Sequence, residues 1–293
     1  MAASPFIIRI AMLNADTPVP NVLAKVGSYG NLFHGLLKAA AKHVAPNLAI
    51  ESEDFDVVRG EYPRSASDFD ALLITGSAAS SYDDSEWNHK LDEYLLSVYE
   101  TCPRVKIFGS CFGHQIVCQS ILRKYGVIIE KDPKGWELGV HEIQLNEAFL
   151  EALGPGFCSA NREPTPETAN DPQPPSPKTL RLQFIHADHV KIPEGKSLPS
   201  PWLLMGWTKH CAVQGVYEPG RVLTYQGHFE FDRFINTKTL EVFGAKWDTK
   251  ALQSGLEAMD KDDDSKEAAR MVVRFLLEGR SVVYGGDGLM TPP

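Results

Sequence analysis

The segment Lys106-Ile-Phe-Gly-Ser-Cys-Phe-Gly-His-Gln115 carries the most informative pattern in the chain. Its apolar start has the composition of a β-strand and runs directly into Gly109. Cys111 follows two residues later, and Gly113 opens a stretch with helical spacing of apolar residues. A strand, a turn through a cysteine between two glycines, and then a helix are together typical of a nucleophile elbow.

The spacing around Cys111 has a physical purpose. A nucleophile elbow holds its central residue in a strained turn, and small flanking residues allow the backbone to pass close to itself. A cysteine at the amino end of a helix also feels the partial positive charge of unpaired N–H groups, which stabilises its thiolate. The alternative is that Cys111 is only a small buried residue at a strand end, because free cysteine is among the most buried residue types.

Alternating strand and helix patterns lie on the N-terminal side of this segment. Apolar runs of strand length cover residues 6–13, 50–58 and 71–75, and apolar residues recur at helical spacing over 32–44 and 87–98. Parallel strands need crossover connections, so this alternation predicts an α/β fold with a mostly parallel central sheet flanked by helices. Functional sites of such folds form at the carboxyl edge of the sheet.

Beyond the helix predicted over about 113–125, the pattern changes. Shorter β-type pieces follow at residues 127–130, 140–145, 180–185, 212–217 and 222–225. These pieces either extend the sheet or form a small antiparallel layer.

A second chemical feature lies late in the chain, in Leu223-Thr-Tyr-Gln-Gly-His-Phe-Glu230. The segment has the pattern of a strand that leads into Gly227 and His228. Residues i and i+2 of an extended chain share a side, so Glu230 is placed to orient His228 and to stabilise its imidazolium after it takes the thiol proton. An ion pair at a strand end without further consequence would give the same pattern.

Taken together, the two segments resemble the class I glutamine amidotransferase family, whose signature is a Gly-x-Cys-x-Gly-x-Gln elbow and a late Gly-His-Pro-Glu-type segment. Three further pieces add to the resemblance: Thr75-Gly-Ser77 followed by Tyr82-Asp83 and Trp87, Lys134-Gly-Trp-Glu-Leu-Gly-Val140, and His186-x-Asp188-x-Val190. The matches span about residues 6–235. The chain is most similar to the stand-alone branch, which includes GMP-synthase-like amidotransferase proteins and plant γ-glutamyl peptidases.

The resemblance implies a complete site. Its members are a catalytic triad of Cys111, His228 and Glu230, an oxyanion hole with the N–H groups of Gly76 and Phe112, and substrate contacts from Gln115, His186 and Asp188. From the residues alone, a polar pair at a strand end explains His186 and Asp188 equally well. Phe229 departs from the family pattern, because many members carry proline there, and this departure bears on the local turn and on the substrate.

The implied chemistry is acyl transfer. The thiolate of Cys111 attacks a γ-glutamyl carbonyl, a γ-glutamyl thioester forms, and water activated by His228 releases glutamate. The site needs no cofactor and no metal, and neighbouring histidines such as His186 and His189 are more often hydrogen-bonded structural groups than metal ligands.

The sequence does not determine which leaving group departs when the thioester forms. Ammonia would make the protein a glutaminase subunit that serves a separate ammonia-accepting synthase chain, whereas a peptide or amine would make it a γ-glutamyl peptidase. No Walker A loop is found in the sequence, and residues 236–293 are too few for a synthetase domain, which favours a stand-alone hydrolase. A recruited hydrolase acting on a specialised metabolite and a non-catalytic binding protein remain as alternatives.

The length and charge of the chain limit the kinds of partner that we expect it to bind. The chain has 293 residues and a net charge of -9, so we expect one large α/β domain or two small ones, and neither nucleic acid nor a membrane as partner. The five cysteines are widely spaced and form no CxxC pair, so we expect reduced thiols and a cytoplasmic protein.

We predict a single glutamine amidotransferase-like domain over 1–293. Residues 160–178 hold six prolines among polar residues, which predicts a flexible surface insertion or, less simply, a lid or docking segment. Residues 236–293 are predicted to form a C-terminal helical extension, and the acidic run 260–264 within it to be a solvated face or loop.

Overall fold

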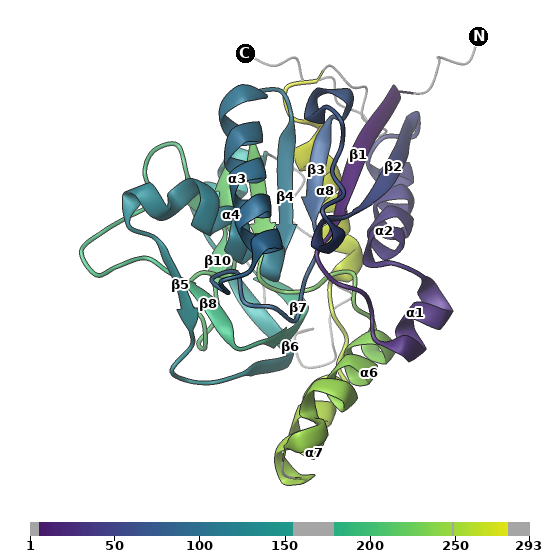
Figure 1. The fold of residues 1–293 in the computed structure, drawn as a ribbon, viewed down its shortest axis with the longest axis vertical. Coiled ribbons are helices and arrows are strands. Elements are labelled where there is room, and N and C mark those ends of the chain that lie inside the picture. The colour runs from purple at the N-terminus through teal and green to yellow at the C-terminus, as the bar shows by residue number, and fades with distance from the viewer. Residues whose placement is uncertain (1–5, 155–178, 248, 281–293) are drawn as a thin grey trace, which may run out of the picture.

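A seven-stranded sheet forms the centre of the molecule (Figure 1). The computed structural model describes residues 6–154, 179–247 and 249–280. In sheet order the strands are β2 (Leu48–Asp56), β1 (Phe6–Asn14), β3 (Ala71–Ile74), β4 (Lys106–Ser110), β12 (Val222–Tyr225), β11 (Val216–Glu218) and β9 (Leu203–Leu204). The first five are parallel to one another, and β11 and β9 continue the sheet in antiparallel pairing. The predicted mostly parallel α/β fold is thereby confirmed.

Helices cover both faces of this sheet. On one face, α2 (Tyr29–Val44) and α8 (Ser265–Leu277) pack with the strands in one hydrophobic cluster. On the other face, α3 (Glu86–Thr101) and α4 (Phe112–Leu122) form a second cluster with the strands. Each fully buried Leu, Ile or Phe side chain in such a cluster contributes about 1.5–3 kcal/mol through the hydrophobic effect. The central sheet is therefore buried on both faces, as parallel sheets require.

Two small antiparallel sheets flank the central one. Their strands are β6 (Glu137–Leu145), β7 (Thr179–His186) and β10 (Gly206–Trp207) in one, and β5 (Ile128–Lys131) and β8 (Asp188–Lys191) in the other. They confirm the predicted antiparallel extension. The prediction of a strand over 212–217 was wrong for residues 212–215, because Gln214 and Gly215 bond irregularly to the backbone of Met205, Gly206 and Gln226.

The remaining α-helices are short, with seven to eleven residues each. They are α1 (Pro20–Val26), α5 (Glu147–Leu153), α6 (Arg233–Phe243) and α7 (Thr249–Ala258). In Figure 1, β3 and β4 point downward, and α6 and α7 extend below them. Asp232 begins α6 as its N-cap, where its carboxylate accepts the N–H of Ile235 at 2.7 Å.

The described part of the C-terminal range, residues 236–247 and 249–280, contributes to the hydrophobic core. The buried face of α8 includes Met271, Val272 and Phe275 and packs against α2. Ahead of this helix, the carboxylate of Asp264 binds the guanidinium of Arg181 at 3.0 Å, so part of the acidic run is paired. The proline-rich segment 160–178 and the residues after Arg280 lie outside the described part of the chain.

Phe229, which departs from the proline that the family resemblance leads us to expect, is a core residue. Its ring lies 5.3 Å from the ring of Phe33 and 5.8 Å from that of Phe108, and it is fully buried. Buried edge-to-face ring pairs add about 0.5–1.5 kcal/mol beyond their area, so this aromatic cluster stabilises the segment around Phe229.

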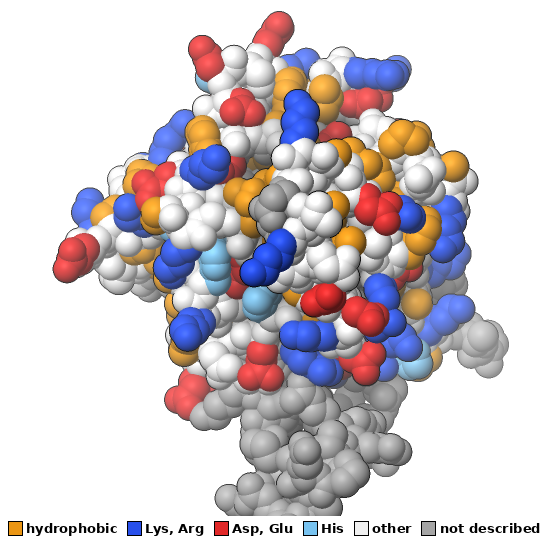
Figure 2. All heavy atoms as spheres, turned by 90° about the horizontal axis from the view of Figure 1, so that it is seen from below, with side chains coloured by type: hydrophobic (Ala, Val, Ile, Leu, Met, Phe, Trp, Pro, Cys, Tyr) orange, Lys and Arg blue, Asp and Glu red, His pale blue; other side chains and the backbone are white. Residues whose placement is uncertain are grey.

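Figure 2 shows the molecule from below in the view of Figure 1, from the side on which β3 and β4 end. Acidic and basic side chains are interspersed across this face, with hydrophobic side chains between them. Within residues 6–154, 179–247 and 249–280, no helix has both the length and the apolar character needed to cross a bilayer.

Candidate active site

Two neighbouring parallel strands bring the two sequence segments together. Strands β4 and β12 pair directly, with Ser110 opposite Tyr225 at their carboxyl ends. The N–H of Cys111 then donates to the carbonyl of Tyr225 at 2.8 Å. Because both strands end at the same edge, the residues that follow each of them share one site.

Cys111 has the backbone geometry of an elbow. Its φ is 53° and its ψ is -108°, and no other non-glycine residue in the described ranges has a positive φ. A Cβ on Gly109 would overlap the carbonyl of Gly113, and a Cβ on Gly113 would overlap the carbonyl of Ile74. The two glycines therefore allow the turn to pass close to itself and to β3, while Cys111 carries the strain.

We expect Gly113→Ala to destabilise the protein by about 1–3 kcal/mol, because the added methyl group has no room beside the backbone of Ile74. Gly35→Ala is the matched control, since Gly35 lies inside α2 and a Cβ there would meet nothing within 4 Å. Alanine is the better helix former, so the control should be neutral or stabilising by up to about 1 kcal/mol. Urea unfolding measures both variants. Equal stabilities would contradict the close-packed elbow.

His228 and Glu230 form a buried pair beside this turn. Nδ1 of His228 lies 2.7 Å from Oε1 of Glu230, and only 3% of either residue is exposed. Ser110 Oγ donates to both carboxylate oxygens of Glu230, at 3.2 and 3.3 Å. The ring of Phe231 stacks on the imidazole, with centroids 4.0 Å apart and planes 10° apart. The imidazole is thus fixed at its Nδ1 side and on one face, which leaves its Nε2 available.

The electrostatics of the pair favour a charged imidazole. Burial lowers the pKa of His228, but the charge of Glu230 and then the Cys111 thiolate outweigh it and raise this pKa from 6.5 to about 10. Among the described residues, Nε2 of His228 has no hydrogen-bond partner of good geometry. A proton on His228 is therefore stabilised beside the thiol and is not committed to another protein group.

Gly76 lies against both reactive groups. A Cβ on Gly76 would sit 3.0 Å from Cε1 of His228 and 3.6 Å from Cβ of Cys111. Its N–H donates to no acceptor in the described part of the chain. Phe112 is the first residue of α4, so its N–H has no partner within the helix. Both N–H groups predicted for an oxyanion hole are thus close to Cys111, and neither has a hydrogen-bond acceptor within residues 6–154, 179–247 and 249–280.

Hydrogen bonds link the three predicted substrate-contacting residues, of which Gln115 and His186 are buried and Asp188 is half-buried. Nε2 of Gln115 donates to the carbonyl of Asp188 at 3.1 Å, and Nδ1 of His186 lies 2.9 Å from the same oxygen. The carboxylate of Asp188 accepts hydrogen bonds from Ser80 and from Tyr82. The side chains of Gln115 and His186 therefore meet at the backbone carbonyl of Asp188, whereas the carboxylate of Asp188 is held by Ser80 and Tyr82.

Glu137 anchors this network. Its carboxylate lies 2.9 Å from Nε2 of His186 and also binds the side chains of Thr208 and Gln214 at 2.6 and 2.8 Å. Burial alone would raise the pKa of Glu137, but the contacts with His186, Thr208 and Gln214 lower it to about 2. Trp136, which precedes it, is 40% exposed and contacts the ring of Trp247 instead.

Three residues at the site were missed by sequence reasoning. Ser110 holds Glu230, Phe231 stacks on His228, and Gln226 donates to Sγ of Cys111 at 3.6 Å. Each is next to, or two residues from, a member of the predicted triad. Proximity in sequence was the available signal, but the pairing of β4 with β12 is what brings Gln226 to Cys111.

The other described cysteines have inert surroundings. Burial raises the pKa of the Cys118 thiol well above its ordinary value and that of Cys211 to about 12. Cys102 is half-buried near the hydroxyls of Ser67 and Thr101. Cys158 lies outside the described residues.

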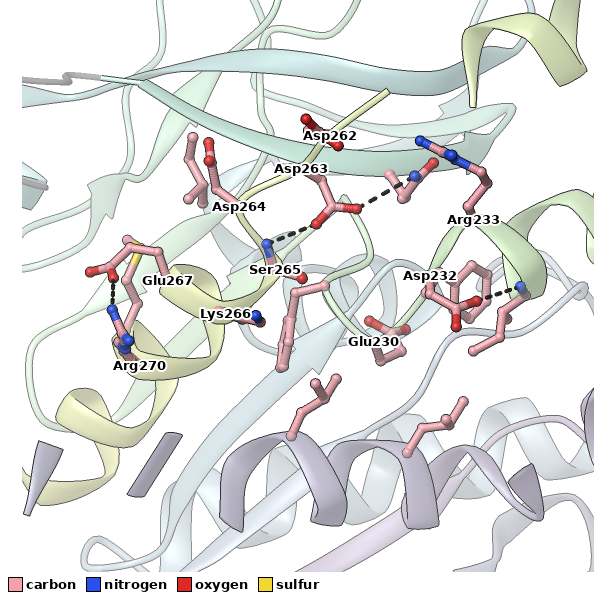
Figure 3. Close-up of a pocket in the computed structure, with 18 of the residues that line it drawn as sticks. Glu230, Asp232, Arg233, Asp262, Asp263, Asp264, Ser265, Lys266, Glu267 and Arg270 are labelled. Carbon is pink, nitrogen blue, oxygen red and sulfur yellow. Dashed lines mark hydrogen bonds and ion pairs between the residues drawn. The ribbon is translucent and has the colours of Figure 1, made fainter. Parts of the chain in front are cut away.

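Glu230 also lines a cavity of about 970 Å³ (Figure 3). Its walls come from α2, β7 and the beginnings of α6 and α8. Some of its charged side chains are already engaged, since Arg270 binds Glu267 at 3.0 Å and Asp263 accepts the N–H of Ser265 at 3.1 Å. Neither Cys111 nor His228 lines it, so the cavity is separate from the elbow.

Relatives of this chain are found among known proteins. A glutamine amidotransferase-like protein of Schizosaccharomyces pombe is 30% identical over 277 residues, which cover 92% of this chain and 99% of that protein. Gamma-glutamyl peptidase 2 of Arabidopsis thaliana is 23% identical over 284 residues, which cover 93% of this chain and 96% of that protein. A search of family models finds no match.

Solved structures share the fold. A glutamine amidotransferase of Thermotoga maritima superimposes with a TM-score of 0.60 at 14% identity, covering 92% of this chain and 96% of that one. A glutamine amidotransferase of Methylobacillus flagellatus gives a TM-score of 0.56 at 16% identity, covering 99% and 100%. With near-complete coverage by the Schizosaccharomyces pombe relative as well, the chain belongs to the class I glutamine amidotransferase-like family.

Proposed function

We propose that this protein hydrolyses γ-glutamyl amide bonds through a covalent thioester on Cys111. The observation that supports the proposal best is the strained backbone of Cys111 at the amino end of α4, beside the buried pair of His228 and Glu230. A buried cysteine with a purely structural role needs neither a positive φ nor an adjacent imidazole with an uncommitted Nε2. In the proposed triad, Cys111 is the nucleophile, His228 the general base and acid, and Glu230 the group that orients His228.

In the proposed acylation step, His228 holds the proton of the Cys111 thiol, and the thiolate sulfur attacks the γ-carbonyl carbon of the substrate. The carbonyl oxygen takes the negative charge and is met by the N–H groups of Phe112 and Gly76. The carbon–nitrogen bond then breaks, and His228 gives its proton to the departing nitrogen. The products of this step are a γ-glutamyl thioester on Cys111 and a free amine or ammonia.

The proposed deacylation step uses water. His228 removes a proton from the water as its oxygen attacks the thioester carbon, and the carbon–sulfur bond breaks. Glutamate leaves and the thiolate of Cys111 is restored next to the protonated His228. The raised pKa of His228, about 10, suits this resting ion pair.

Named relatives support a glutamyl substrate and two kinds of leaving group. The relatives in Arabidopsis thaliana are named gamma-glutamyl peptidases, and those in Schizosaccharomyces pombe and Saccharomyces cerevisiae are named as glutamine amidotransferases or amidotransferase-like proteins. We favour the peptidase, because gamma-glutamyl peptidase 2 of Arabidopsis thaliana aligns with this chain over 96% of its own length.

The test is a substrate panel. The purified protein and Cys111→Ala are incubated with glutamine, γ-glutamyl dipeptides and glutathione conjugates, and both glutamate and ammonia are measured. We expect glutamate from γ-glutamyl peptides without ammonia, dependent on Cys111. Ammonia from glutamine would instead favour the glutaminase subunit with a separate acceptor chain. No Cys111-dependent release from any member of the panel would contradict the glutamyl assignment.

A further inference from the structure

Gln226 is a buried amide in contact with the nucleophile. Its Nε2 lies 3.6 Å from Sγ of Cys111, within hydrogen-bond range for sulfur, and the residue is fully buried. It occupies the first position after β12, directly beside the turn that follows β4. The triad leaves this amide without a role, although it touches the atom that reacts.

The orientation of the amide follows from its neighbours. The backbone carbonyl of Asp188 can only accept a hydrogen bond, so the group of Gln115 that faces it at 3.1 Å must be the NH₂. That same NH₂ lies 3.1 Å from the other end of the Gln226 amide, which must then be its oxygen. The NH₂ of Gln226 is therefore the end that faces Sγ of Cys111.

The chain of hydrogen bonds continues away from the sulfur. The carbonyl of Asp188 is also in contact with His186, whose other ring nitrogen meets the buried carboxylate of Glu137. The amide of Gln226 thus lies at the end of a network that is anchored in β6 and β7. Because the Gln226 oxygen is bonded to Gln115, and Gln115 in turn to Asp188, these contacts hold the Gln226 side chain in one rotamer.

We propose that Gln226 donates a hydrogen bond to the thiolate of Cys111, fixing its rotamer and stabilising its charge, and that Gln115 is the positioning residue that aims this donor. Gln115 thereby has a role besides the substrate contact implied by the family resemblance. A hydrogen bond to a charged acceptor is stronger than one to a neutral acceptor, so the contact favours the thiolate over the thiol. The inference rests on the proposed function only in that Cys111 is taken as the nucleophile.

The rate at which Cys111 is alkylated reports how much of it is present as thiolate, and this measurement needs no γ-glutamyl substrate. The rate of reaction with iodoacetamide is measured against pH on the Cys111 peptide by mass spectrometry, because Cys102 is partly exposed. Three titratable groups around Cys111 stay unchanged in every variant: His228 and Glu230 after β12, and Tyr29 of α2.

Gln226→Met keeps the length of the side chain and removes the donor. We expect the alkylation rate of Cys111 at neutral pH to fall by at least about 10-fold, as loss of a charged hydrogen bond implies, and the midpoint of the pH profile to move upward. Gln226→Glu should lower the rate further, because it places an acidic group beside the thiolate. An unchanged rate and midpoint in a folded Gln226→Met protein would overturn the proposal.

Gln115→Met tests the second half of the inference and serves if Gln226→Met does not fold. It should reproduce the direction of the Gln226→Met effect with a smaller size. Gln119→Met is the matched control, since Gln119 lies one turn further along α4 and its amide binds Ser81 instead. Equal alkylation rates for Gln115→Met and the control would overturn the positioning role. Failure of the glutamyl substrate panel would leave these alkylation results intact, so the two proposals fail separately.

Discussion

Replacing Cys111 with alanine is expected to lower kcat/KM for a γ-glutamyl substrate by at least about 10⁴-fold, because acylation has no other nucleophile and triad members act as a unit. Thermal stability should change little, since only the thiol is removed and the strained turn keeps a small side chain. Initial rates of glutamate release from the best substrate of the panel measure the effect.

Cys102→Ala is the control for this variant. Cys102 is half-buried at the end of α3, and the hydrogen-bond partners of its thiol are the hydroxyl groups of Ser67 and Thr101, neither of which belongs to the proposed site. We expect its kcat/KM to stay within about two-fold of the wild type, as for a substitution remote from the site. Substantial turnover by Cys111→Ala would contradict the covalent mechanism.

Replacing Glu230 with glutamine is expected to lower kcat by about 10³- to 10⁴-fold while leaving the fold intact. The amide keeps the shape and can still bond Ser110 and His228, but it removes the negative charge that lies 2.7 Å from the imidazole. The loss should therefore appear in kcat more than in KM. A Glu230→Gln enzyme with nearly full kcat would show that the carboxylate charge is not needed.

The same variant has a stability signature that depends on pH. In the wild type, the pKa of His228 is raised from 6.5 to about 10, so its stabilising contribution is fully present below pH 6.5 and is lost as the pH rises through 10. The charge of Glu230 is the main cause that raises this pKa. In Glu230→Gln, the fall in stability between pH 7 and 10 should be smaller, as urea unfolding at several pH values would show. An identical pH dependence in both proteins would contradict the assigned pair.

The elbow could be predicted from sequence because its constraints are local. Glycines at 109 and 113 are needed wherever the backbone passes this close to itself, and the structure places both against neighbouring carbonyls. The pairing of His228 with Glu230 was equally accessible, since residues i and i+2 of an extended chain share a side.

The surroundings of the site could not be predicted in the same way. The contact between Gln226 and Cys111 depends on which strand lies next to β4, and a sequence pattern does not give strand order. The burial of Phe229 depends likewise on Phe33 from a distant helix, so the residue that looked like a departure in the turn is a core residue.

The irregular backbone of residues 212–215 could not be predicted from the sequence either. Residues 212–215 have strand composition, yet their hydrogen bonds go to residues 205–206 and 226 in no regular ladder. Buried polar side chains such as Gln214, which binds Glu137 at 2.8 Å, determine this course. Apolar periodicity carries no information about such contacts.

Trapping the acyl-enzyme tests the central claim most directly. The protein is mixed with its best γ-glutamyl substrate, quenched in acid during turnover, digested and mapped by mass spectrometry. We predict a γ-glutamyl group on the peptide that contains Cys111, released by hydroxylamine as a thioester should be, and a larger trapped fraction in Glu230→Gln if deacylation is slowed more than acylation. Substrate turnover with no modification of Cys111, or with the label on another cysteine, would contradict the account.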